Sequence, residues 1–246
     1  MARSVFLHST GTGPALWARV PPEITEGTDR LLVSNLGYAP NPPVPRGEVV
    51  TLSDEVDHAL AAIGDPTAPL DVRAHSYGAT IALALIGRAN IRSLFLVEPV
   101  LFGALARVPV EPAVQAELAS FLTDPWFLDD AERGGTEEWL SLFVDYWNRP
   151  GAFAGMPEPL RAAQRALGWK MFQEVRACFY GMDAFPVVPP EIPLTLALGE
   201  RTTASSKAMT RALAEIHPQA RVIVLPGTGH MAPLTHPERV FAAMRA

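Results

Sequence analysis

Short apolar runs alternate with helix-length amphipathic segments near both ends of the chain. Six of these runs are apolar nearly throughout, which is typical of parallel strands that are covered on both faces. They lie at residues 4–8, 31–34, 70–74, 93–97, 194–198 and 221–225. Because helical segments separate them, the pattern predicts an α/β fold with a doubly wound, mainly parallel sheet of about six strands.

Two helix starts stand out. Thr51 is followed three residues later by Asp54, and Thr235 by Glu238, with Pro237 between them. This spacing is typical of a capping box, in which two side chains satisfy backbone N–H groups at the first turn. We therefore expect one helix over residues 51–63 and a last helix that Thr235 caps.

The alternation breaks between residues 100 and 185. This stretch is helical in character and holds 14 of the chain's 20 aromatic residues. Its breaks fall at Asp124-Pro125, Gly134-Gly135 and residues 148–151, and a proline-rich return follows at residues 186–193. We expect a core of residues 1–99 and 186–246, with residues 100–185 inserted as an α-helical cap. The sequence leaves open which aromatic side chains pack inside the cap and which face a pocket.

Composition narrows the classes of function. Of the 246 residues 48% are hydrophobic and 19% charged, which allows a large core. A net charge of −6 without a basic run argues against nucleic acid and anionic membranes as partners. The single Cys178 permits no internal disulfide, and the six scattered histidines suggest no metal site. With no signal-peptide layout at the start, we expect a cytoplasmic protein that acts on a small molecule without a cofactor.

Ser76 lies between an expected strand and an expected helix. Residues 73–78 are Arg-Ala-His-Ser-Tyr-Gly, so Ala74 and Gly78 flank the serine at two positions on either side. A sharp turn between a strand and a helix requires such small residues, because the two elements approach closely. The turn would present the hydroxyl beside a helix N-terminus, which favours negative charge. An ordinary turn that happens to carry a serine is the alternative interpretation.

This segment resembles the nucleophile elbow of the α/β-hydrolase family, Gly-x-Ser-x-Gly, with Ala74 in place of the first glycine. The resemblance extends over nearly the whole chain. It implies that Ser76 is a nucleophile and that an acid and a histidine follow in that order. Residues 226–231, which contain Gly229 and His230, resemble the family's Gly-His loop after the last strand. His230 is therefore expected to be the base, and His75 to pack beside the site.

Three residues are candidates for the acid. Family members most often take it from the loop after the strand at 194–198, but Thr202 stands where the aspartate is expected, and a hydroxyl does not replace a carboxylate. Glu98 ends the strand at 93–97 on the edge where such sheets place their sites, so it is favoured. Glu200 is the second candidate and Asp183 the third.

The resemblance also implies an oxyanion hole made of the backbone N–H groups of Tyr77 and Thr10, in a loop where Ser9 replaces the usual glycine. It implies a serine hydrolase that cleaves a small, mostly apolar carboxylic ester or thioester. A serine nucleophile argues against dehalogenase and epoxide-hydrolase chemistry, which resembles members with aspartate at this position. Lyase, acyltransfer or cyclase chemistry on the same triad stays open. A ligand-binding protein on an inactive scaffold is a further alternative.

Overall fold

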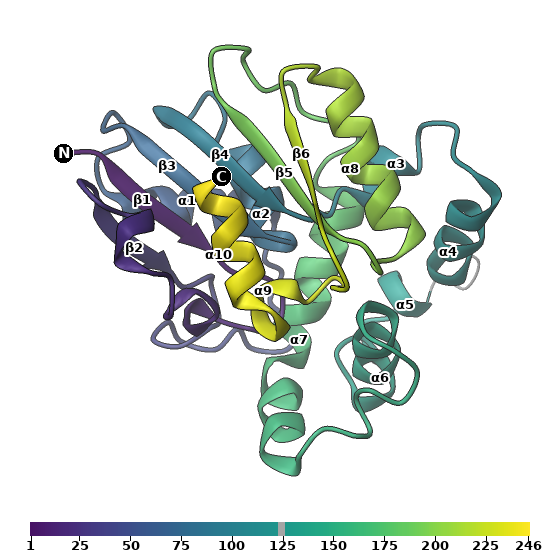
Figure 1. Ribbon diagram of the computed structural model, residues 1–246. Helices are drawn as coiled ribbons and strands as arrows, with labels where there is room; N and C mark the ends of the chain where they lie inside the picture. Colours follow the sequence, from purple (N-terminus) through teal and green to yellow (C-terminus); the bar gives the residue numbers. More distant parts are fainter. Residues whose placement is uncertain (123–125) are drawn as a thin grey trace.

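The computed structural model describes residues 1–122 and 126–246. Six strands form one parallel sheet in the order β2-β1-β3-β4-β5-β6 (Figure 1). Their bounds are β1 Arg3–Leu7, β2 Asp29–Val33, β3 Leu70–His75, β4 Ile91–Val97, β5 Leu194–Gly199 and β6 Arg221–Leu225. The predicted α/β fold and parallel sheet are confirmed, and each of the six runs forms a strand.

The strand order places β3 next to the point where the winding of the sheet reverses. The chain runs from β1 to β2 on one side and then crosses to β3 on the other, so the direction of winding reverses between β1 and β3. In open α/β sheets ligands bind beyond the carboxyl ends of the strands at such a point. Ala74 of β3 pairs with Leu7 of β1 and with Leu96 of β4, so Ser76 follows at the carboxyl end of a strand with neighbours on both sides.

Helices cover both faces of the sheet because its strands are apolar on both. Val5 and Leu7 of β1 belong to one core cluster, whereas Phe6 between them belongs to another. The first cluster packs against α1 (Leu52–Ile63), α2 (Tyr77–Ala84) and α8 (Ala204–Ile216). The second packs against α10 (Pro237–Arg245) and the short 3₁₀ helix Pro14–Trp17. The alternation along one strand thus builds a three-layer molecule.

One of the two predicted capping boxes is present. Thr51 Oγ1 accepts from Asp54 N–H at 3.2 Å, and Asp54 Oδ2 accepts from Thr51 N–H at 2.8 Å. The prediction for Thr235 is wrong, because this residue ends a separate short helix, α9 (Ala232–Thr235), and its hydroxyl donates to Met231 O. Helix α10 begins after His236 without a side-chain cap.

The described residues between β4 and β5 form helices and connecting turns. The helices are α3 (Phe102–Leu105), α4 (Pro112–Leu122), α5 (Trp126–Asp129), α6 (Glu137–Trp147) and α7 (Glu158–Tyr180). The predicted breaks at Gly134-Gly135 and residues 148–151 separate α5 from α6 and α6 from α7; the break at Asp124-Pro125 lies outside the described residues. Figure 1 shows α4, α5 and α6 beside one end of the sheet.

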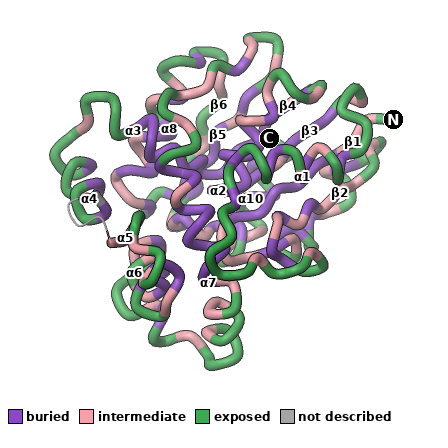
Figure 2. Tube along the Cα trace, turned by 180° about the vertical axis from the view of Figure 1, so that it is seen from behind, coloured by how far each residue is buried: buried purple, intermediate pink, exposed green. Residues whose placement is uncertain are grey.

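Helix α7 joins this helical segment to the rest of the molecule. Its first half is largely exposed, whereas from Gly168 onward most of its residues are buried (Figure 2). The buried half packs against α2 and α3. Among the described helices, none is both long enough and apolar enough to cross a bilayer.

Candidate active site

Ser76 occupies the sharp turn between β3 and α2. Its φ of 55° lies in the left-handed region that non-glycine residues rarely adopt. Gly78 explains the need for small neighbours, because a Cβ there would lie 2.6 Å from the carbonyl oxygens of both Leu7 and His8. The end of β1 therefore packs directly on the first turn of α2. The turn holds the Ser76 hydroxyl at the carboxyl edge of the sheet.

The loop after β6 brings His230 to this serine. His230 Nε2 lies 3.0 Å from Ser76 Oγ, and His230 Nδ1 lies 2.6 Å from Glu98 Oε2. A neutral imidazole with its proton on Nδ1 donates to Glu98 and accepts from the serine hydroxyl. Three side chains from distant parts of the sequence thus form one hydrogen-bonded line, with the imidazole between a hydroxyl and a carboxylate.

Glu98 follows β4 and is completely buried. Its backbone also adopts a positive φ, 47°, which turns the chain at the strand end. Besides His230, its carboxylate accepts hydrogen bonds from Gly199 N–H at 2.7 Å, and from Thr202 Oγ1 and Ser206 Oγ at 2.6 Å each. Burial alone raises the pKa of Glu98, but His230 and the two hydroxyl donors outweigh it and lower that pKa to about 2. The carboxylate is therefore held in its charged form.

The structure gives the other acid candidates different roles. Glu200 Oε2 accepts from Gly227 N–H at 2.8 Å, and Asp183 pairs with Arg107 at the surface at 3.8 Å. Thr202, which the sequence suggests only as a missing aspartate, instead donates to Glu98. Of the three acid candidates, Glu98 is therefore the one whose carboxylate lies against His230.

Two further rings fix the imidazole of His230. The indole of Trp147, the last residue of α6, stacks on it with a centroid distance of 3.8 Å and an interplanar angle of 24°. His75 Nε2 lies 2.9 Å from His230 O, so a neutral His75 donates to the backbone of the loop. Burial is the main cause that lowers the pKa of His75 to about 3, which keeps it neutral. The expectation that His75 packs beside the site agrees with this position. The only sequence signal for Trp147 was the abundance of aromatic residues.

The two residues predicted as oxyanion donors lie on different elements, Thr10 in the loop after β1 and Tyr77 at the start of α2. Thr10 lies on the wall of the cavity beside Ser76. Tyr77 is the first residue of α2, where a backbone N–H has no acceptor within the helix. Ser9 is buried, its carbonyl accepts from both Thr12 N–H and Thr12 Oγ1, and the two hydroxyl groups lie 3.1 Å apart. The serine that replaces the usual glycine thus closes a hydrogen-bonded turn around Thr10.

Gly11, the next residue, is held from two sides. Its N–H donates to Tyr38 Oη at 2.7 Å, and its carbonyl accepts from Gln164 Nε2 at 2.8 Å. Gln164 belongs to α7, so the helical segment between β4 and β5 touches the loop directly. Both bonds restrain the backbone on which Thr10 sits.

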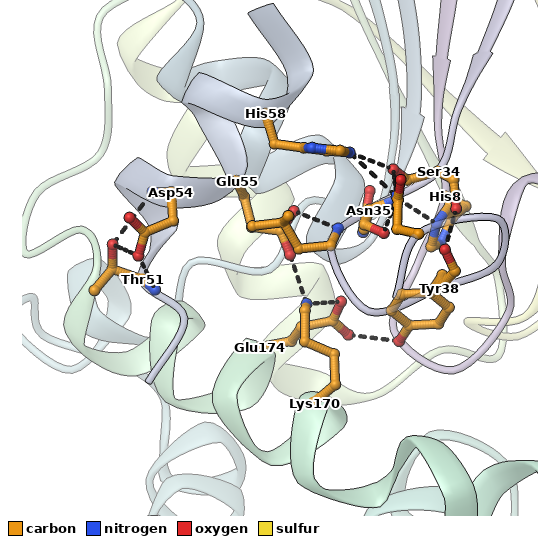
Figure 3. A network of polar contacts seen from close by, with 12 residues as sticks. His8, Ser34, Asn35, Tyr38, Thr51, Asp54, Glu55, His58, Lys170 and Glu174 are labelled. Atoms are coloured by element: carbon orange, nitrogen blue, oxygen red, sulfur yellow. Dashed lines mark hydrogen bonds and ion pairs between the residues drawn. The ribbon is translucent and has the colours of Figure 1, made fainter. Parts of the chain in front are cut away.

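Tyr38 is hydrogen-bonded to a buried ionic network (Figure 3). Tyr38 Oη donates to Glu174 Oε2 at 2.9 Å, and Lys170 Nζ lies 2.6 Å from Glu174 Oε1 and 2.5 Å from Glu55 Oε1. Glu55 in turn accepts from Leu36 N–H at 3.1 Å. Burial alone lowers the pKa of Lys170, but the two carboxylates outweigh it and raise that pKa. The network joins α1, α7 and the turn after β2 to the loop after β1, and sequence reasoning missed it.

His8 lies beside this network, with its ring edge-on to that of Tyr38 and the centroids 4.7 Å apart. Its Nδ1 lies 2.9 Å from Ser9 O, and its Nε2 accepts from Asn35 N–H at 3.1 Å. Burial is the main cause that lowers the pKa of His8 to about 4. A neutral ring suits both contacts, because a second ring proton would face the N–H of Asn35.

Two hollows meet at Ser76. An inner one has a volume of about 20 Å³ and an outer one of about 130 Å³. A larger hollow of about 610 Å³ is lined by residues of α3, α4 and α8 rather than by the Ser76 cluster. Within the described part of the chain, no group of three His, Cys, Asp or Glu side chains is arranged to hold a metal ion.

Comparison with known proteins agrees with this geometry. Residues 5–243 match the model of the alpha/beta hydrolase family, and the chain belongs to that family. Membership in it supports a hydrolase that acts on small molecules. The sequence has no significant match among curated proteins.

Solved structures show the same fold at low identity. A thermophilic esterase from Thermogutta terrifontis is 19% identical with a TM-score of 0.65, over 100% of this chain and 88% of the esterase. The carboxylesterase CesB from Bacillus subtilis is 16% identical with a TM-score of 0.62, over 99% and 82%. The haloalkane dehalogenase DatA from Agrobacterium tumefaciens C58 is 18% identical with a TM-score of 0.66, over 99% and 88%. At these identities the similarity shows the fold alone.

Proposed function

We propose that the protein is a serine hydrolase that cleaves a small, mostly apolar carboxylic ester or thioester through an acyl-enzyme. One observation carries the proposal: Ser76 Oγ, the two nitrogens of His230 and the Glu98 carboxylate lie in line, with separations of 3.0 and 2.6 Å. Glu98 is the acid of this triad in the proposal, in preference to Glu200 or Asp183.

In the acylation step, Ser76 Oγ attacks the carbonyl carbon while His230 Nε2 takes the hydroxyl proton. The carbonyl electron pair moves onto oxygen, where the N–H groups of Thr10 and Tyr77 stabilise it. Glu98 holds the proton on Nδ1 and stabilises the imidazolium. The tetrahedral intermediate then collapses, the bond to the leaving oxygen or sulfur breaks, and the proton on Nε2 passes to that atom.

In the deacylation step, water takes the place of the leaving group. His230 Nε2 accepts a proton from the water as its oxygen attacks the acyl carbon. Collapse of the second intermediate breaks the bond to Ser76 Oγ and releases the acid, and the proton on Nε2 returns to the serine. Each proton thus passes through one imidazole nitrogen, which the stacked ring of Trp147 and the bond from His75 hold in position.

Residues 100–185 act in this proposal as a cap over the site. Aromatic residues of α6 and α7 line the hollows at Ser76, among them Phe143, Trp147 and Phe179. They exclude water from the reacting atoms, which strengthens the electrostatic interactions there. Part of the aromatic content of the segment therefore serves the substrate pocket.

A binding protein on an inactive scaffold is less well supported. Loss of catalytic function removes the need to keep Glu98 close to His230, yet the two lie 2.6 Å apart and the carboxylate keeps three further donors. Lyase, acyltransfer and cyclase reactions run on similar triads and differ from hydrolysis in the shape of the pocket and the access of water. Product analysis by mass spectrometry separates them from hydrolysis.

A fluorophosphonate probe tests the proposal. We expect it to label Ser76 in the wild-type protein, and the Ser76→Ala variant to lose both the labelling and the turnover of 4-nitrophenyl acetate. Ser120→Ala, which changes an exposed serine on α4, is the matched control and should retain both. Unchanged turnover in Ser76→Ala would end the proposal.

A further inference from the structure

The cavity at Ser76 has two lobes of different size and chemistry. The inner lobe measures about 20 Å³ and the outer lobe about 130 Å³. Thr10, Ser76, Phe143 and Trp147 line both, so the nucleophile and one expected oxyanion donor stand where the lobes join. A substrate whose carbonyl carbon lies at Ser76 must place one of its two halves in each lobe.

The position of His230 indicates which lobe holds the leaving group and which holds the acyl chain. Among the described residues, His230 lines the outer lobe and not the inner one. The proton on Nε2 must reach the leaving atom when the tetrahedral intermediate collapses. The leaving group therefore occupies the outer lobe, and the acyl chain the inner lobe.

The inner lobe is small because aromatic rings fill its walls. Phe102 stacks on Phe179 with centroids 4.6 Å apart, and Phe121 packs on Phe127 at 5.0 Å. All four side chains are buried. Since one water needs at least about 10–15 Å³, a volume of about 20 Å³ admits one or two small groups beyond the carbonyl carbon. That space corresponds to an acetyl or a propionyl chain.

The residues that line the two lobes indicate the charge of the substrate. Neither lobe has Asp, Glu, Lys or Arg among the described residues that line it. The outer lobe combines apolar side chains, such as Met156 and Leu234, with the uncharged polar groups of Thr12, Asn148 and Gln164. An ionised substrate would lose its hydration there without gaining an ionic partner, which is unfavourable.

We infer that the substrate is an uncharged ester or thioester of a two- or three-carbon acid, with a larger and mostly apolar leaving group. This inference rests on the proposed hydrolase function and adds the division of the substrate between the lobes. The inner lobe limits the size of the acyl chain. Whether the substrate must be uncharged is tested by changing the charge of the leaving group.

A series of 4-nitrophenyl esters with acyl chains of two, three, four, six and eight carbons tests the inner lobe. We expect kcat/KM to be highest for acetate or propionate and to fall by about 10-fold or more by the hexanoate. A second pair tests charge, because methyl 4-acetoxybenzoate and 4-acetoxybenzoate differ in the charge of the leaving group. We expect the charged ester to react about 10-fold more slowly in kcat/KM.

Matched variants locate the effect. Phe127→Ala enlarges the inner lobe and should shift the optimum toward butyrate or hexanoate, whereas Met156→Ala in the outer lobe should leave the chain-length profile unchanged. Phe127→Leu is the milder variant if Phe127→Ala does not fold. A wild-type preference for hexanoate or octanoate overturns the inference, and so does an unchanged profile in the folded Phe127 variant.

Labelling by the fluorophosphonate probe distinguishes failure of the lobe assignment from failure of the hydrolase proposal. If Ser76 reacts with the fluorophosphonate and long-chain esters are preferred, the lobe assignment is wrong while the hydrolase proposal stands. If Ser76 stays unlabelled and no ester is turned over, both are wrong.

Discussion

The hydroxyl of Tyr38 joins the buried ionic network to Gly11 in the loop after β1. It accepts from Gly11 N–H at 2.7 Å and donates to Glu174 at 2.9 Å. Tyr38→Phe removes this oxygen and keeps the ring, so packing changes little. Two polar groups then lose a partner: the N–H of the partly buried Gly11 and one carboxylate oxygen of the buried Glu174.

The expected loss follows from these two bonds. A hydrogen bond between neutral groups contributes about 0.5–1.5 kcal/mol and one to a charged group about 1.5–3 kcal/mol, so the free energy of unfolding should fall by about 3 kcal/mol. Loss of a whole oxyanion donor costs about 3 kcal/mol in activation free energy. A loosened loop that keeps the Thr10 donor should cost about 1 kcal/mol, which lowers kcat about 5-fold. The reason is that Gly11 restrains the loop and does not itself bind the substrate.

Urea unfolding measures the first quantity, and steady-state kinetics with 4-nitrophenyl acetate the second. We expect kcat to fall while KM stays nearly constant. Tyr180→Phe is the control, because that hydroxyl is bonded to Asp129 at the surface and its loss should change stability by less than about 0.5 kcal/mol. If Tyr38→Phe matches the wild type in both stability and kcat, the network does not position the loop.

Three more predictions follow from buried charge. Glu98→Gln keeps the size of the side chain but removes its charge, and should lower kcat about 10⁴-fold in the same esterase assay. Lys170→Met leaves two carboxylates without their cation and should lower the free energy of unfolding by about 3–5 kcal/mol in urea; adding Glu55→Gln should restore part of it. Folded His8 and His75, with pKa values of about 4 and 3, stay neutral below pH 6.5 while the unfolded chain binds protons. Their contribution to stability therefore declines as the pH falls from 6.5 to 4, by up to about 2.7 kcal/mol per unit, and His8→Gln should remove half of that slope.

Each of these has a contradicting result. Turnover of Glu98→Gln within about 10-fold of wild type would show that the carboxylate does not stabilise the imidazolium. A Lys170→Met protein as stable as the wild type would show that the ion pairs of Lys170 do not stabilise the fold. An unchanged pH slope in His8→Gln, measured by urea titration from pH 7 to 4, would place the proton uptake elsewhere.

The sheet could be predicted from the sequence because each strand carries its own signal. The six apolar runs appear as six strands, although β2 and β4 each begin two residues earlier than expected. Helix ends were harder to predict from the sequence, because they depend on the positions of neighbouring turns. Thr51 caps its helix as predicted, whereas Thr235 has the same spacing and ends a different helix.

For the candidate site, local motifs were informative and long-range contacts were not. Ser76 and His230 follow from the strands and loops around them, and the structure brings them together with the favoured acid, Glu98. The bond from Thr202 to that acid was missed, since it joins residues more than 100 positions apart. The same holds for Lys170, whose spacing to Glu174 is also typical of a solvated helix face.

The stacking of Trp147 on His230 links the position of helix α6 to the surroundings of the imidazole. Since Trp147 is the last residue of α6 and its indole lies nearly parallel to the imidazole, a displacement of that helix would also uncover the ring. In the proposed mechanism, such a displacement would change the surroundings of the group that transfers the proton.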